Sequence, residues 1–174
     1  VQQQLPIWIA VGGTTSSVLR AAKLGLPIMF AIIGGQPIHF KPLVEYYKEN
    51  YLAHGHDPEK MQVGINSHLF IGENNAIKDE YFPFYASQMD NIGKSRGWSP
   101  FSKEAFMNTT RPEGAYFMGD TNAVIDKILQ QHEWFGHTHF VGQVDVGDPD
   151  HSMLMKSIEL FGTKVAPKVR EALK

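Results

Sequence analysis

Residues 6–17 read PIWIAVGGTTSS, and this stretch determines the fold class. Its first six residues are apolar without interruption, which is typical of a strand buried on both faces of a parallel sheet. Gly12 and Gly13 follow, where the backbone can take a positive φ and approach a ligand closely. Ser16 or Ser17 then predicts the N-cap of a helix that begins near Val18. The stretch therefore predicts a strand, a glycine turn and a helix, in the order found in α/β proteins.

The same turn is a candidate anion site. Backbone amides, hydroxyl groups and the positive end of a helix would meet there, and this combination holds phosphate in many folds. We therefore predict that Gly12, Gly13, Thr14 and Thr15 bind a cofactor phosphate. The alternative is an ordinary turn in which the glycines serve the backbone geometry alone.

Composition limits the class of protein. The 174 residues are enough for a real core, so we expect 1–174 to form a single domain. The net charge of −2 indicates no general attraction to nucleic acid or to anionic membranes, and no apolar run suggests a membrane span. The lack of cysteine excludes disulfides, thiolate catalysis and thiolate metal sites. No signal segment opens the sequence, so we expect a cytoplasmic protein.

The strand, turn and helix recur four times along the chain. We predict strands at 6–11, 26–33, 63–71 and 139–146. We predict helices at 18–24, 40–52, 76–95 with a kink or break at Pro83, 123–134 and 151–161, the last continuing or restarting through 165–173. Residues 96–119 read as an irregular insertion. Four parallel βα units correspond to half of an eight-unit barrel, and the start at Val1 without Met suggests that a preceding segment is missing.

Seven short stretches, in order along nearly the whole chain, are similar to one family of enzymes. They are 6–14 (PIWIAVGGT), 21–29 (AAKLGLPIM), 31–35 (AIIGG), 67–71 (SHLFI), 114–120 (GAYFMGD), 157–163 (SIELFGT) and 165–167 (VAP). The chain resembles the C-terminal half of a luciferase-like flavin-dependent monooxygenase. The resemblance implies an α/β fold in which parallel βα units form the C-terminal half of a (β/α)8 TIM barrel.

The resemblance also implies a cofactor and partners. Reduced FMN, supplied by a separate flavin reductase, would react with O2 to oxidise a small organic substrate, and a reduced deazaflavin is the less expected cofactor. In the family, the turn equivalent to Gly12–Thr14 lies beside the cofactor phosphate. About four earlier βα units are absent, so we expect the isolated chain to be inactive. We also expect it to form a homo-oligomer through its open sheet edges.

Three further residues are candidates for the site, each with a structural alternative. His68, inside the third strand, is a weak catalytic candidate, and the alternative is a core histidine satisfied by its neighbours. Gln36, in the turn after the second strand, and Arg111, in the insertion, are candidates for substrate binding. Their alternatives are a solvated turn residue and a mobile surface loop.

No metal site is predicted. The pairs His54/His56 and His137/His139 lack a carboxylate set of the H-E-x-x-H kind, so we interpret them as exposed loop histidines. The aromatic run at 81–85 is interpreted as helix packing, because no basic residues interleave with it. Gln143 and Asp145 share one face of the last predicted strand and could line the barrel interior.

Two other functions remain open at this point. The chain could be a non-catalytic half-barrel fragment or a flavin-free binding subunit, since half of a barrel is missing. A more distant alternative is an unrelated flavodoxin-like or phosphate-sugar-binding α/β protein.

Overall fold

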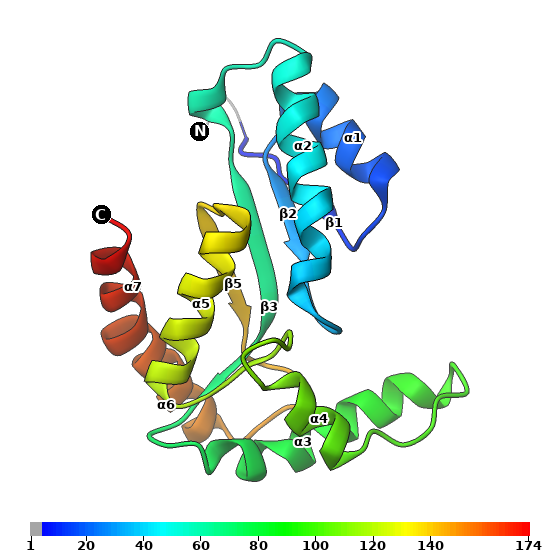
Figure 1. The fold of residues 1–174 in the computed structure, drawn as a ribbon. Coiled ribbons are helices and arrows are strands. Elements are labelled where there is room, and N and C mark those ends of the chain that lie inside the picture. Colours follow the sequence, from blue (N-terminus) through cyan, green and yellow to red (C-terminus); the bar gives the residue numbers. More distant parts are fainter. Residues whose placement is uncertain (1–4) are drawn as a thin grey trace. The chain divides into compact units, whose positions relative to one another are not determined.

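The structure is a computed structural model that describes residues 5–174, in which strands and helices alternate (Figure 1). The strands are β1 (Ile9–Val11), β2 (Ile28–Ala31), β3 (Val63–Ile71), β4 (Phe117–Gly119) and β5 (His139–Gln143). The helices are α1 (Thr15–Lys23), α2 (Lys41–Ala53), α3 (Ile77–Lys94), α4 (Lys103–Thr109), α5 (Thr121–Phe135), α6 (His151–Leu160) and α7 (Ala166–Ala172). None of the helices in this part of the chain has the length and apolarity needed to cross a membrane.

The pairing of the strands confirms the predicted α/β class. β1 pairs with β2 and β2 with β3, in parallel, with Ile9 opposite Ile28 and Ile28 opposite Val63. β5 pairs with β3, and the backbone N–H of Thr138 donates to the Val63 carbonyl at 2.8 Å. The four predicted strands are therefore neighbours in chain order, as expected for consecutive βα units.

The prediction for 96–119 was wrong, because this segment is not irregular throughout. It contains α4, whose Ser102 side chain caps the helix by accepting from the Ala105 N–H at 3.1 Å. It also contains β4, a fifth strand that pairs in parallel with the end of β3. Thr110, Pro112 and Gly114, which helped to suggest a loop, lie in the connection between these two elements.

The chain forms two compact units, and β3, α5 and β5 contribute residues to both. The first comprises residues up to Ile32, Pro37–Asn66 and Gln131–Val141. In it, α1 and α2 lie together beside β1 and β2 (Figure 1). Ile28 and Phe30 are fully buried while Met29 and Ala31, on the other face of β2, are partly exposed. This period-two alternation identifies a strand with one well-covered face.

The second unit comprises Ile33–Gln36, Ser67–Gln130 and Gly142–Lys174. Its core is aromatic: the rings of Phe70 and Tyr81 stack at 3.8 Å, and Tyr85 packs against Phe106. The hydroxyl of Ser157 on α6 accepts from the backbone N–H of Ile71 at 2.9 Å, which attaches α6 to the end of β3. The predicted role of residues 81–85 in helix packing is therefore confirmed.

Three helix ends test the capping chemistry predicted from the sequence, and two of them follow it. Gly25 takes φ +64° after α1, as a glycine C-cap does, and Asp120 caps α5 by accepting from the Ala123 N–H at 2.9 Å. The exception is the start of α1. The helix begins at Thr15, with Thr14 in extended conformation as its N-cap, instead of beginning near Val18 after a serine cap.

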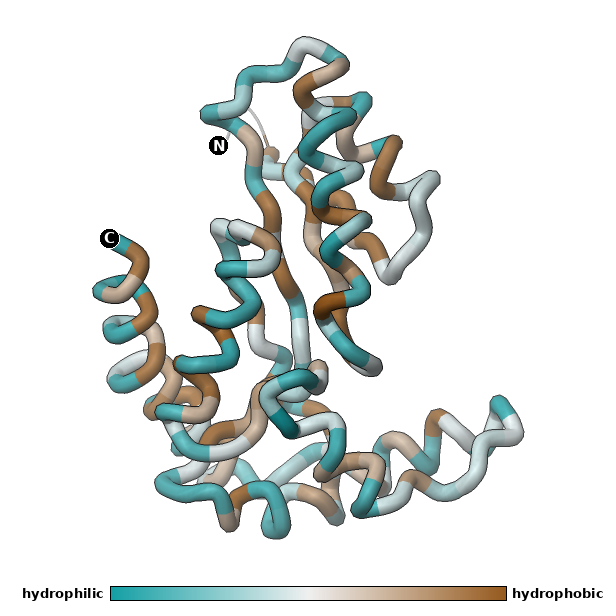
Figure 2. The backbone as a smooth tube through the Cα atoms, in the orientation of Figure 1, coloured by the Kyte–Doolittle hydropathy of each residue, from teal (hydrophilic) through white to brown (hydrophobic). Residues whose placement is uncertain are grey.

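Pro83 and Pro167 lie inside helices without ending them. α3 runs through Pro83, so of the predicted kink or break, the break is absent. Pro167 lies in the first turn of α7, where its missing N–H costs little, and the π-helical turn Phe161–Val165 joins α6 to α7 directly before it. Figure 2 shows the hydrophobic segments running along the strands, while the helices alternate between hydrophobic and hydrophilic residues.

Gly147, in the turn after β5, is predicted to tolerate no side chain. It has φ +88°, and a Cβ built there would lie against the backbone of Phe84 in α3. Gly147→Ala should therefore lower the free energy of unfolding by about 3 kcal/mol, through backbone strain together with the clash. Urea unfolding followed by circular dichroism measures the change.

Gly12→Ala is the matched control for that substitution. A Cβ at Gly12 has no neighbour within 4 Å, and its φ is not positive. Its effect on stability should be below about 0.5 kcal/mol. An equal loss of stability in the two variants would contradict the packing described for the turn after β5.

Candidate functional site

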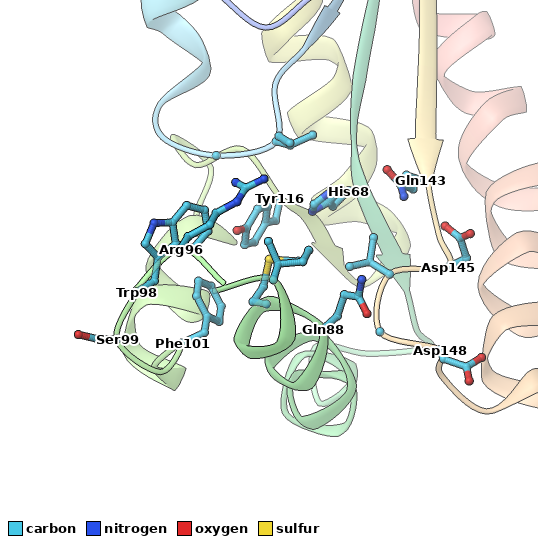
Figure 3. Close-up of a pocket in the computed structure, with 16 residues that line it drawn as sticks. His68, Gln88, Arg96, Trp98, Ser99, Phe101, Tyr116, Gln143, Asp145 and Asp148 are labelled. Atoms are coloured by element: carbon cyan, nitrogen blue, oxygen red, sulfur yellow. The ribbon is translucent and has the colours of Figure 1, made fainter. Parts of the chain in front are cut away.

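A cavity of about 720 Å³ opens in the second unit (Figure 3). Its walls come from β3, α3, the segment between α3 and α4, the residue before β4, and the segments that follow β2 and β5. The lining residues are Ile33, Gly34, His68, Gln88, Met89, Ile92, Arg96, Trp98, Ser99, Phe101, Tyr116, Gln143, Asp145, Val146, Gly147 and Asp148. The size, and the mixture of apolar walls with a few polar groups, are typical of a site for a small molecule.

His68 is a buried residue of this cavity, with 7% of its surface exposed. Its Nδ1 lies 2.7 Å from the hydroxyl oxygen of Tyr85, in a hydrogen bond that is itself buried. The imidazole also stacks on the ring of Tyr116, with ring centroids 5.7 Å apart. Two tyrosines on different elements thus hold the ring in one orientation.

The electrostatics keep His68 neutral at physiological pH. Burial lowers the pKa of His68 to about 4, and the nearby Asp145 carboxylate opposes this only in part. Burial likewise raises the pKa of Tyr85 well above its usual value, so its hydroxyl stays protonated. A neutral imidazole, hydrogen-bonded to the neutral phenol of Tyr85, therefore lines the cavity, and it can donate and accept hydrogen bonds without carrying charge.

Charged groups lie toward the exposed side of the cavity. The Arg96 guanidinium stacks over the Trp98 ring at 4.9 Å from its centroid. Gln143 and Asp145 both line the cavity, from the end of β5 and the segment after it (Figure 3). Both residues therefore reach the same site as His68, although Asp145 lies beyond the end of β5 and not, as was predicted, on the strand.

Gln36 and Arg111 line a different, smaller cavity. It has a volume of about 360 Å³ and includes Glu113. The structure therefore brings together the two residues predicted to bind substrate, although they lie far apart in the sequence. Both are exposed.

The turn Gly12–Thr15 lies in the first unit and is exposed. Gly13 has φ +121°, and a Cβ at either glycine would meet no atom within 4 Å. The backbone N–H groups of Ser17 and Val18 are both occupied by the Thr14 carbonyl. The backbone conformation therefore requires glycine at position 13. Both glycines leave the surface of the turn open, as a contact with a phosphate group would need.

Sequence reasoning missed several residues of the larger cavity. Tyr85 and Tyr116 position His68, and Arg96 and Trp98 form its exposed side. Tyr85 carried a usable signal, because Tyr81 and Tyr85 are spaced i, i+4 on one helix. Arg96 and Trp98 carried none, since they lie in a segment that read as an irregular insertion.

The histidine pairs have structural partners. His54 Nδ1 contacts the Asn50 carbonyl at 2.7 Å and His56 Nε2 the Lys23 carbonyl at 3.0 Å. His137 was predicted to be exposed, and this was wrong: it is buried and packs edge-on against the ring of His132, with centroids 5.3 Å apart. Within residues 5–174, no three histidine or carboxylate side chains gather as a metal site would require.

Comparison with solved structures identifies the fold. The monooxygenase RslO1 from Streptomyces bottropensis is similar with a TM-score of 0.73 and 18% identity, over 93% of this chain and 47% of that one. The oxygenating constituent of 3,6-diketocamphane monooxygenase from Pseudomonas putida, solved with FMN, is similar with a TM-score of 0.66 and 19% identity. This similarity covers 94% of this chain and 48% of that one. The coenzyme F420-dependent tetrahydromethanopterin reductase from Methanopyrus kandleri has a TM-score of 0.63 and 19% identity, over 95% of this chain and 51% of that one. The fold is that of a half-barrel of parallel βα units, and the chain spans about half the length of these structures.

The sequence places the chain within a family. The profile of the family described as luciferase-like monooxygenase matches residues 1–151, and the chain belongs to that family. Among curated protein sequences, no significant match was found. The resemblance inferred from the short motifs is thereby confirmed, and the unrelated α/β alternatives are excluded.

The two buried histidines predict a pH-dependent stability. Burial lowers the pKa of both His68 and His137 from 6.5 to about 4. Between these values the unfolded chain takes up protons that the folded chain does not, so the free energy of unfolding falls as the pH falls from about 6.5 to 4. Each histidine contributes up to about 1.4 kcal/mol per pH unit.

Urea unfolding at several pH values across this range measures that slope. His68→Gln and His137→Gln should each reduce it by about half, and the double variant should flatten it most. A slope that is the same in all four proteins would contradict the neutral state of the buried rings.

Proposed function

We propose that this chain is the C-terminal half of a flavin-dependent monooxygenase that uses reduced FMN and O2 on a small organic substrate. Membership of the luciferase-like family supports an oxidoreductase. The observation that carries the proposal is the cavity of about 720 Å³ in which a neutral His68 is held by Tyr85 and Tyr116. Such a cavity suits an uncharged or weakly polar organic molecule.

The proposed cofactor is FMN in preference to a deazaflavin, with a separate flavin reductase as its source of electrons. Both kinds of cofactor occur among the similar structures, one solved with FMN and another described as coenzyme F420-dependent. When bound, reduced FMN supplies the electrons that activate O2. We assign its phosphate to the turn Gly12–Thr15, because this turn is open and precedes the nine-residue helix α1.

His68 would orient the substrate, and it is our candidate for a catalytic residue. Because Tyr85 stays protonated, its hydroxyl can donate to Nδ1 and fix the tautomer that carries its proton on Nε2. The ring would then offer one N–H donor to a carbonyl or hydroxyl oxygen in the cavity. The apolar residues around it would exclude water from the reacting groups.

We expect Gly12→Ala to weaken FMN binding in a protein that joins this chain to a first half-barrel. The added methyl group would project into the open space where the phosphate approaches, so the Kd should rise at least about tenfold, or about 1.4 kcal/mol. Fluorescence titration with FMN measures the Kd. Gly13→Val, the more obvious substitution, is less clean because its φ of +121° would strain any side chain.

Gly162→Ala serves as a control for the number of glycines replaced, since Gly162 lies between α6 and α7, has no positive φ and has open space around its Cβ position. FMN affinity that is unchanged by Gly12→Ala, in a protein with native circular dichroism, would contradict the phosphate assignment.

We further propose that the isolated chain associates and lacks turnover. β5 alternates between exposed and half-buried residues along its whole length, and Val141 on it is 43% exposed. An exposed strand with apolar side chains pairs readily with another chain. Sedimentation at micromolar concentration should show a dimer or larger species without bound flavin.

A well-folded monomer at every concentration would contradict this expectation. A monomer that bound a small molecule but no flavin would instead support the second candidate, a flavin-free binding subunit. That candidate is favoured by one observation, the match to only about half of each similar structure.

A further inference from the structure

We propose that a third cavity, lined by Lys78, Arg111 and Lys127, binds the phosphate group of a small anionic ligand. The cavity lies in the second unit and has a volume of about 580 Å³. It shares no residue with the turn Gly12–Thr15 or with the His68 cavity. The inference therefore goes beyond the proposed flavin chemistry and does not depend on it.

Lys127 is the central observation, because lysine is rarely buried without a carboxylate partner. It lies on α5 with 5% of its surface exposed. Its Nζ donates to the carbonyl oxygens of Tyr116 at 2.7 Å and Thr110 at 3.2 Å. An ammonium group has three donors, so two neutral carbonyls leave one donor for a ligand. The Phe117 ring, with its centroid 5.6 Å from Nζ, compensates the charge in part through a cation–π contact.

Two more cations line the same cavity. Lys78 comes from the first turn of α3 and Arg111 from the segment after α4. Among the described residues, none of the three cations lies within 4.0 Å of a carboxylate, although five such pairs form elsewhere on the chain. The positive groups are therefore available to an external anion.

The charge balance favours a dianion. Asp126 is the one carboxylate among the residues that line this cavity in the described chain, so three cations face a single negative charge. Arginine offers a planar fork of donors and lysine a point charge, and together they match a phosphate group. A carboxylate would neutralise one charge only, which is why phosphate is preferred.

The protonation of Lys127 would couple to this binding. Burial lowers the pKa of Lys127 to about 7, with Lys78 lowering it further and Glu113 raising it. The other groups that face it are the exposed Arg111 and the exposed Asp126 on its own helix. A bound dianion favours the charged ammonium, so Lys127 should take up a proton on binding near pH 7.

Isothermal titration of the 174-residue chain with inorganic phosphate tests the proposal, with acetate titrated in parallel. We expect phosphate to bind in the millimolar range or tighter and acetate at least tenfold more weakly. Because inorganic phosphate itself titrates near pH 7, proton uptake by Lys127 is measured with sulfate, which stays a dianion, and the sulfate enthalpy should vary with the ionisation enthalpy of the buffer.

Lys78→Gln and Arg111→Gln should each weaken phosphate binding about tenfold, and neither substitution disturbs a buried group. Lys127→Met, which keeps the apolar stem, should abolish the buffer dependence as well. Lys41→Gln, on the surface of α2 and paired with Glu45, is the control and should leave the affinity unchanged. Absence of phosphate binding, equal affinity for acetate, or equal losses in the control and the site variants would overturn the assignment.

Discussion

The structure depends on the burial of β3. This nine-residue strand is buried over nearly its whole length and pairs with β2, β4 and β5. A strand in this position has no solvent for its backbone groups, so neighbouring strands must satisfy them. The ladders to β2 and β4 do this along successive parts of β3, and the Ser157 hydroxyl satisfies the last N–H at Ile71.

The same burial creates the chemistry of the site. His68 is a polar residue within this buried strand, and a polar group without a hydrogen bond there would cost several kcal/mol. Tyr85 provides the bond from α3, and Tyr116 covers the ring from the segment before β4. The constraint that keeps the strand stable therefore also holds a neutral imidazole, in a fixed orientation, at the wall of a cavity. The two interpretations of His68, a satisfied core residue and a functional one, are compatible in this structure.

The sequence predicted the strands well and the connections less well. The third strand, 63–71, matched to the residue, because uninterrupted apolar residues between turn signals identify a buried strand. Residues 96–119 were misjudged because local turn residues say nothing of the tertiary pairing that forms β4. The start of α1 was placed three residues late, since Thr14 acts as N-cap through its backbone conformation without a side-chain hydrogen bond. The larger cavity could be predicted only in part, because Arg96 and Trp98 reach it from the segment after α3 and Tyr85 positions His68 through the packing of α3.

The central claim is that this half-barrel supplies part of a flavin site. Its most direct test is the visible absorbance spectrum of the purified chain before and after it is joined to a first half-barrel and loaded with FMN. We expect the joined protein to retain about one flavin per barrel after gel filtration, while the 174-residue chain alone should retain none. A joined protein that folds with native circular dichroism and retains no flavin would contradict the account.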